Sequence, residues 1–80
     1  MSDDAWFTRI LALPDAAQFP AIVSRLARLD ADGATALWEA WRGFVAETPG
    51  LAENAGTQTF ATHLRRGVER AVSAGYRHVA

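Results

Sequence analysis

Residues 34–45 read ATALWEAWRGFV, and their apolar side chains recur with the spacing of an α-helix. At about 100° per residue, the apolar side chains fall within roughly 120° of arc on one helix face. The members of this apolar stripe are Ala34, Leu37, Trp38, Trp41, Phe44 and Val45. Two tryptophans one turn apart give the helix a large apolar area to bury. We therefore expect this helix to lie at the centre of a helical core.

Length and composition describe one small domain, residues 1–80, because a chain this short has no room for a second core. Half of its residues are hydrophobic, and the absence of cysteine excludes disulfides and thiolate metal sites. No apolar run approaches the roughly 20 residues of a membrane span. The first four residues, MSDD, are acidic, whereas a secretory signal begins with positive charge. These features predict a cytoplasmic protein that has no membrane partner.

Prolines and glycines divide the chain into four helical segments. The first helix is expected from about Asp3 to Leu13, and the second begins with Pro20 at its first helical position. The third is expected from an Asp32 N-cap to Glu47 or Thr48, and the fourth from Thr57 or Thr59 into the last residues. Because the connections are short, we expect an all-α fold, a compact four-helix bundle with antiparallel neighbours. A type II turn centred on Pro49-Gly50 and an extra short helical turn near 50–55, pinned by Leu51, are also expected.

The second and fourth helices have apolar faces of their own. The expected core face of the second helix is Phe19, Ile22, Val23, Leu26 and Leu29, with Ser24, Arg25 and Arg28 facing solvent. On the fourth helix, Gly67, Ala71 and Gly75 place small residues at every fourth position of the apolar face. Such spacing allows a neighbouring helix to approach closely, and we expect that neighbour to be the region around Trp38 or Trp41.

The first helix has more apolar width than one core face needs. Phe7 and Leu11 extend its apolar arc to roughly 160°. One interpretation is that these two side chains remain on the surface as a patch for a partner. The other is that they pack under the 48–57 loop or against the last helix.

The net charge of −1 hides an asymmetry between the two parts of the chain. Residues 1–56 carry four arginines and eight acidic residues, a charge of −4, whereas residues 57–80 carry four arginines and one glutamate, a charge of +3. Arg66, Arg70 and Arg77 lie within about 40° of one another on the last helix; we call them the basic ridge. Its expected counterpart in head-to-tail contacts between copies is acidic: Asp30, Asp32 and Glu39. A solvated helix face explains the same arginines without any partner.

Motifs that carry chemistry are absent from the sequence. The two histidines, His63 and His78, have no carboxylate at a ligand-like offset, and there is no glycine-rich phosphate loop or nucleophile elbow. We therefore expect no enzyme activity, no catalytic residue, no cofactor and no metal site. Nucleic acid is an unlikely partner, because a chain with a net charge of −1 lacks the basic footprint of nucleic-acid-binding domains.

Residues 11–26, LALPDAAQFPAIVSRL, resemble the opening of the effector-associated, death-fold-like adaptor domains of bacterial conflict systems. In those domains a short first helix ends at Leu-Pro, as at Leu13-Pro14, and a Gln-Phe pair begins the next, as at Gln18-Phe19. The resemblance implies a small bacterial adaptor that pairs with like domains and brings effectors to sensors. Death-fold domains usually have six short helices, so the long last segment is a departure, and no functional residue is carried over.

These observations predict a non-catalytic protein–protein interaction module, either a homotypic adaptor or an oligomer-forming accessory protein. The expected partner-binding residues are Phe7, Leu11, Asp30, Asp32, Glu39, Arg66, Arg70 and Arg77. An alternative is a small immunity-like or antitoxin-like protein that binds one partner tightly through the first helix. Weak nucleic-acid binding through the basic ridge is the third hypothesis. The sequence leaves the partner's identity, the oligomeric state and the pathway open.

Overall fold

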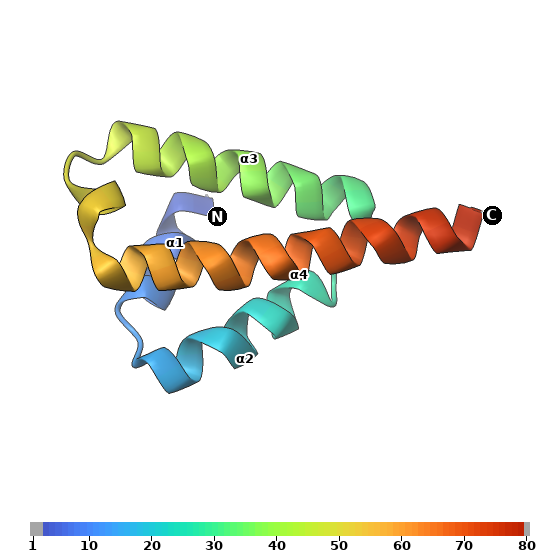
Figure 1. Cartoon of the computed structure of the whole chain (residues 1–80), viewed down its shortest axis with the longest axis horizontal. Coiled ribbons are helices and arrows are strands. Elements are labelled where there is room, and N and C mark those ends of the chain that lie inside the picture. Colours follow the sequence, from blue (N-terminus) through green and yellow to red (C-terminus); the bar gives the residue numbers. More distant parts are fainter. Residues whose placement is uncertain (1–2, 80) are drawn as a thin grey trace.

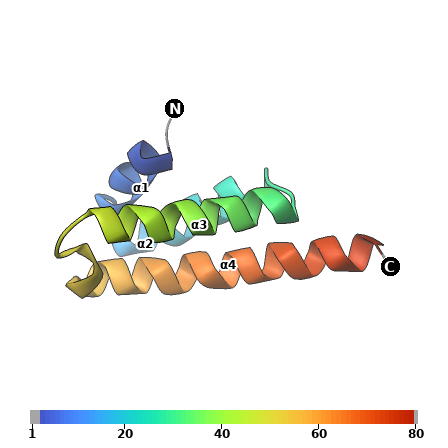
Figure 2. The same cartoon turned by 90° about the horizontal axis from the view of Figure 1, so that it is seen from above.

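The structure is a computed structural model that describes residues 3–79, with side chains through residue 74. Its elements are α1 (Asp3–Leu11), α2 (Asp15–Leu26), α3 (Ala31–Glu47), the 3₁₀ helix η1 (Leu51–Glu53) and α4 (Ala55–Val79). α4 lies along the junction of α2 and α3, and α1 lies on the opposite side of that pair (Figures 1 and 2). The predicted all-α four-helix bundle and its short helical turn near 50–55 are confirmed.

The helices do not all alternate in direction. α3 and α4 run antiparallel, as expected for two helices joined by a short connection (Figure 1). α2 and α4 run in the same direction along the long axis, because α3 lies between them in the chain and returns it to its starting end (Figure 1). α2 and α4 are therefore a parallel pair of packed helices.

The core is centred on aromatic side chains from three helices. The rings of Phe7 on α1 and Trp41 on α3 have centroids 5.2 Å apart, and those of Trp41 and Phe60 on α4 are 4.7 Å apart. Edge-on and tilted aromatic pairs contribute about 0.5–1.5 kcal/mol beyond their burial. Ala34 and Leu37 are buried with Trp41, and the rest of the apolar stripe of α3 packs against this core. The central place predicted for the 34–45 helix is confirmed.

Two helices begin earlier than predicted because an upstream Asp or Asn caps each of them. Asp30, not Asp32, is the N-cap of α3, and its Oδ1 accepts a hydrogen bond from the Gly33 N–H at 2.7 Å. Asn54 Oδ1 accepts from the N–H groups of Gly56 (2.9 Å) and Thr57 (3.2 Å) at the start of α4. These oxygens satisfy N–H groups that the first helical turn leaves without partners. The predicted starts at Asp32 and at Thr57 or Thr59 are therefore wrong by two residues or more.

Pro20 lies inside α2 and not at its first position, which corrects the predicted start of this helix. A proline at this place removes the hydrogen bond to the carbonyl of Ala16, and that residue is exposed, so water can supply the missing donor. The start of α2 is held by Gln18, whose Nε2 donates to the Leu13 carbonyl at 3.1 Å. The buried Gln18 side chain therefore ties the first turn of α2 to the residue that precedes Pro14.

The connection from α3 to η1 is the predicted type II turn. Gly50 has φ 81° and ψ −11°, and the Leu51 N–H donates to the Thr48 carbonyl at 3.2 Å. The positive φ at the third turn position is the conformation that glycine adopts without strain. This turn reverses the chain and brings α4 back along α3.

Arg25 is half-buried between α1 and α2, whereas the sequence placed it in solvent. Its Nη2 donates to Asp3 Oδ1 at 2.9 Å, and its guanidinium carbon lies 5.0 Å from the centroid of the Trp6 ring. The guanidinium thus combines an ion pair with a cation–π contact. Both contacts tie α2 to the first helix.

Candidate functional site

The first-helix patch predicted from Phe7 and Leu11 does not form. Phe7 is 0% exposed, and Leu11 is partly buried against the core. α1 packs against α2, α3 and α4, so both sides of its wide apolar arc are used inside the bundle. Of the two interpretations of the wide arc, the exposed patch is wrong, and packing against the last helix is confirmed for Phe7, whose ring lies 6.5 Å from that of Phe60.

The acidic residues predicted as a docking surface lie on α3 and at its N-terminus, and two of them have local partners. Asp30 caps its own helix, and Glu39 Oε1 lies 3.8 Å from Arg42 Nη1. Asp32 is exposed in the first turn of α3, where a negative charge suits the helix dipole. A role for these residues in contacts between copies stays a prediction; Asp30 is engaged in capping α3, and only Glu39 has an arginine nearby among the described ion pairs.

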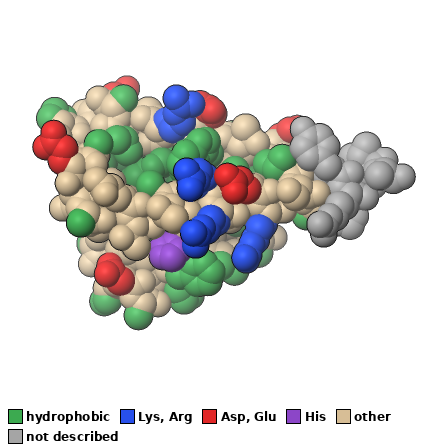
Figure 3. Space-filling view, viewed as in Figure 1, with side chains coloured by type: hydrophobic (Ala, Val, Ile, Leu, Met, Phe, Trp, Pro, Cys, Tyr) green, Lys and Arg blue, Asp and Glu red, His purple; other side chains and the backbone are tan. Residues whose placement is uncertain are grey.

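Arg66 and Arg70 of the basic ridge are exposed on α4, one turn apart. Within residues 3–74, neither of them forms an ion pair, because Glu69 lies 3.9 Å from Arg65 instead. Arginine side chains line this face beside the histidine and an apolar patch (Figure 3). Arg77, the third member of the ridge, lies outside the described side chains.

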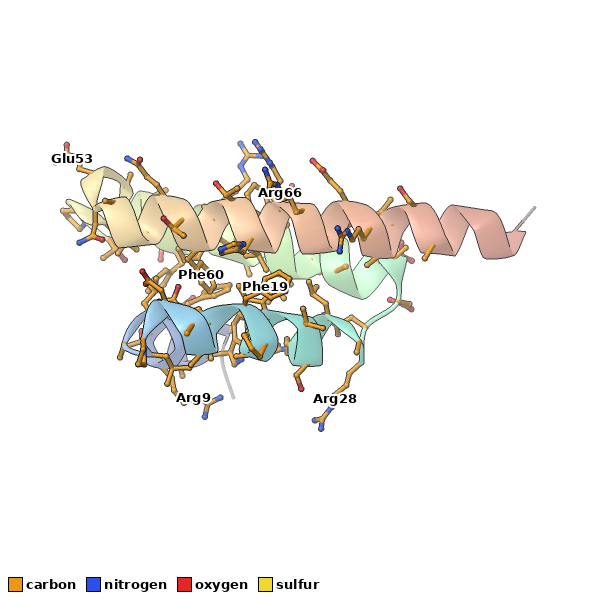
Figure 4. The ribbon with its side chains drawn as sticks, turned by 60° about the horizontal axis from the view of Figure 1, so that its bottom comes forward. Arg9, Phe19, Arg28, Glu53, Phe60 and Arg66 are labelled. Carbon is orange, nitrogen blue, oxygen red and sulfur yellow. The ribbon has the colours of Figure 1, made fainter. Side chains whose placement is uncertain are left out.

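A groove between α2 and α4 lies directly beside these arginines; we call it the α2–α4 groove. It has a volume of about 560 Å³. Its apolar lining is Phe19, Ile22, Val23 and Leu26 of α2, the C-cap residue Ala27, and Gly67 and Ala71 of α4. His63, Arg66 and Arg70 line its α4 side. Phe19 faces α4 in Figure 4, whereas Arg9 and Arg28 point away from that helix.

Phe19 and Val23 were expected in the core, and the structure places them in the wall of the α2–α4 groove. They are 47% and 50% exposed, the largest exposed hydrophobic side chains among the described residues. Phe19 stacks edge-on against His63, with ring centroids 5.3 Å apart. The apolar period of α2 is as predicted, but only the side that carries Ile22 and Leu26 is buried. The apolar periodicity of α2 thus predicts the direction of its apolar face correctly, but α4 covers only part of the width of that face.

Gly67 allows α2 and α4 to approach closely at the base of the groove. A Cβ atom at this position would overlap Cδ1 of Leu26. The small-residue face therefore does admit a neighbouring helix, as expected, but that neighbour is α2. The predicted contact around Trp38 or Trp41 of α3 is wrong at this glycine.

The chemistry of the α2–α4 groove is an apolar lining with a cationic edge. Among the described side chains, no group of three or more His, Asp and Glu residues could hold a metal ion. Within residues 3–79, none of the helices combines the length and the apolar character needed to cross a membrane. The groove suits a ligand that has one apolar face and negative charge beside it.

Comparisons with protein-family models, with curated proteins and with solved structures gave no match for this chain. The resemblance of residues 11–26 to death-fold-like adaptor domains therefore stays a prediction.

Proposed function

We propose that this protein is a non-catalytic protein-interaction module and that the α2–α4 groove is its contact surface. One observation carries the proposal: Phe19 and Val23 leave about half of their surface in solvent directly beside Arg66 and Arg70. Burying apolar surface stabilises a protein by about 25 cal/mol per Å², so leaving it exposed forgoes stability. Aromatic and arginine side chains are also enriched at protein interfaces.

Two kinds of partner are compatible with this function. In a homotypic adaptor, Arg66 and Arg70 face the acidic end of α3 in the next copy, and the exposed Asp32 supports such pairing. In an immunity-like or antitoxin-like protein, the groove holds a segment of one other protein. We favour the immunity-like or antitoxin-like protein. The large exposed hydrophobic side chains among the described residues are Phe19 and Val23, and neither lies on α3, the helix that a homotypic contact would use.

The test compares two substitutions that add the same charge at exposed positions. Val23→Asp places a carboxylate in the groove, and Ala46→Asp places one on α3, outside the groove lining. Tagged wild-type and variant proteins are used to recover partners from the cells that make this chain. The recovered protein is then purified, and its affinity for each form is measured by calorimetry.

We expect Val23→Asp to weaken binding at least about tenfold and Ala46→Asp to leave the affinity unchanged. Far-UV circular dichroism checks that both variants keep the helical fold. Equal affinity for the wild type and Val23→Asp would overturn the proposed contact surface. If none of the recovered and purified proteins binds the wild type, the proposed function is wrong.

A further inference from the structure

We infer that the α2–α4 groove binds an acidic amphipathic α-helix of a partner protein, about two turns long. This inference rests on the proposed function and adds the chemical class of the partner. Three properties of the groove carry it: its length, the nature of its walls and the charge along one edge.

The length of the groove matches a short helical segment. Along α2 and its C-cap the lining runs from Phe19 to Ala27, and on α4 it runs from His63 to Ala71, in the same direction. At about 1.5 Å per residue, eight steps on either helix cover about 12 Å, which is slightly more than two turns of a bound helix. An extended segment of the same length holds only about four residues, and half of their side chains would point out of the groove.

The walls of the groove also favour a helix. Both walls are α-helices, whose backbone N–H and C=O groups bond to one another inside each helix, so there is no open strand edge on which a partner could form a sheet. An extended segment lying here would lose water from its backbone without gaining hydrogen bonds. A helix satisfies its own backbone groups and can turn one apolar face into the groove.

The charge along the edge selects an acidic partner. Arg66 and Arg70 are exposed at the α4 edge, and neither is ion-paired within residues 3–74. The groove lining contains no acidic residue. Glutamates or aspartates one turn apart on the partner helix have the same spacing of about 6 Å. Arginine binds carboxylates through two parallel hydrogen bonds, which favours such pairs over neutral ones.

A second copy of this chain fits the groove less well. In a two-fold contact of groove on groove, Arg66 and Arg70 of both copies enter one interface, and like charges oppose the contact. The acidic residues of α3 lie on a helix whose apolar face is already buried by Ala34, Leu37 and Trp41. That helix cannot fill a second groove while it holds its own core.

A selection that assumes no partner sequence tests the inference. A phage-displayed library of random peptides, each about 16 residues long so that a helix can form, is selected on the wild-type protein. Counter-selection uses the double variant Arg66→Glu/Arg70→Glu. We expect the enriched peptides to carry Leu, Ile or Phe three and four positions apart and acidic residues one turn apart on the adjoining face.

An enriched peptide is then synthesised with a fluorescein label, and its affinity is measured by anisotropy. We expect binding to weaken at least about tenfold for Val23→Asp and for the double charge reversal, and to weaken as sodium chloride screens the charges. The matched control is Arg28→Glu, a charge reversal in the turn after α2 at a side chain that points away from α4 (Figure 4), and it should leave the affinity unchanged. NMR of the labelled peptide should show helical structure in the bound state.

Several results would overturn the inference. The enriched peptides could be neutral or basic, or extended when bound. They could bind the charge-reversed variant as well as the wild type. Finally, the selection could enrich no peptide at all. A wild-type dimer that Val23→Asp abolishes would show that a second copy occupies the groove. If the natural partner loses affinity for Val23→Asp while the peptides fail, the inference is wrong and the proposed function stands.

Discussion

Replacing Phe7 by alanine should destabilise the protein far more than replacing Phe19 by alanine. The two residues form a matched pair, because the same side chain is removed in each case. Phe7 is 0% exposed in the core, and Phe19 is 47% exposed in the groove wall. The comparison therefore separates a structural aromatic residue from one that is available to a partner.

The magnitude follows from burial and packing. A core Phe→Ala substitution costs about 3–5 kcal/mol. The Phe7 ring packs against those of Trp6, Trp41, Phe44 and Phe60, with centroid separations of 5.2 to 6.5 Å. We therefore expect the upper part of that range, about 4–5 kcal/mol. Phe19 has roughly half of its apolar surface to lose and borders an open groove, so we expect about 1 kcal/mol.

Urea unfolding followed by far-UV circular dichroism measures the difference. A domain of this size unfolds with about 4–12 kcal/mol, so Phe7→Ala should remove at least about a third of the free energy of unfolding. Because the two losses differ by about 3–4 kcal/mol, thermal melting should separate the two variants by about 12–32 °C. A loss for Phe7→Ala no larger than that for Phe19→Ala would refute the assignment of Phe7 to the core.

Other predictions address the turn, a helix cap and self-association. Gly50→Ala should lower the free energy of unfolding by about 1–2 kcal/mol, because φ at Gly50 is 81°. Gly43→Ala should instead raise the free energy of unfolding by about 0.5–1 kcal/mol, because Gly43 lies on the exposed side of α3 with no neighbour in contact. Asn54→Ala should lower it by about 1 kcal/mol through the lost N-cap, again by urea unfolding. Light scattering should give a monomer mass at every concentration and salt; a mass that rises with concentration, falls with salt and is lost on Arg66→Glu/Arg70→Glu would instead establish homotypic pairing.

Features that depend on residues close in sequence could be predicted. The apolar stripe of α3 is a local periodicity, and Trp41 is buried where that pattern places it. The type II turn follows from Pro49 and Gly50, because one fixes a negative φ and the other allows a positive one. The adjacency of Arg66 and Arg70 on one helix face is likewise a matter of spacing.

Features that depend on how the helices lie against one another could not be predicted. The apolar arcs of α1 and α2 have similar chemistry, yet Phe7 is covered on every side and Phe19 is left half in solvent. Which arc is fully covered depends on how α3 and α4 lie against α1 and α2. In the α2–α4 groove Phe19 lies next to His63. These residues are far apart in the chain, so no local sequence pattern predicts their contact.

The contact between Gly67 and Leu26 couples these two positions as the chain diverges. A side chain gained first at residue 67 meets Cδ1 of Leu26 and must displace it, whereas a smaller residue gained first at 26 makes room for the second change. The effect of each substitution on stability therefore depends on whether the other is already present. Because both positions also line the α2–α4 groove, lineages that take this path alter their binding surface and their helix spacing together. Among descendants of this chain, a side chain at 67 should accompany a shortened one at 26.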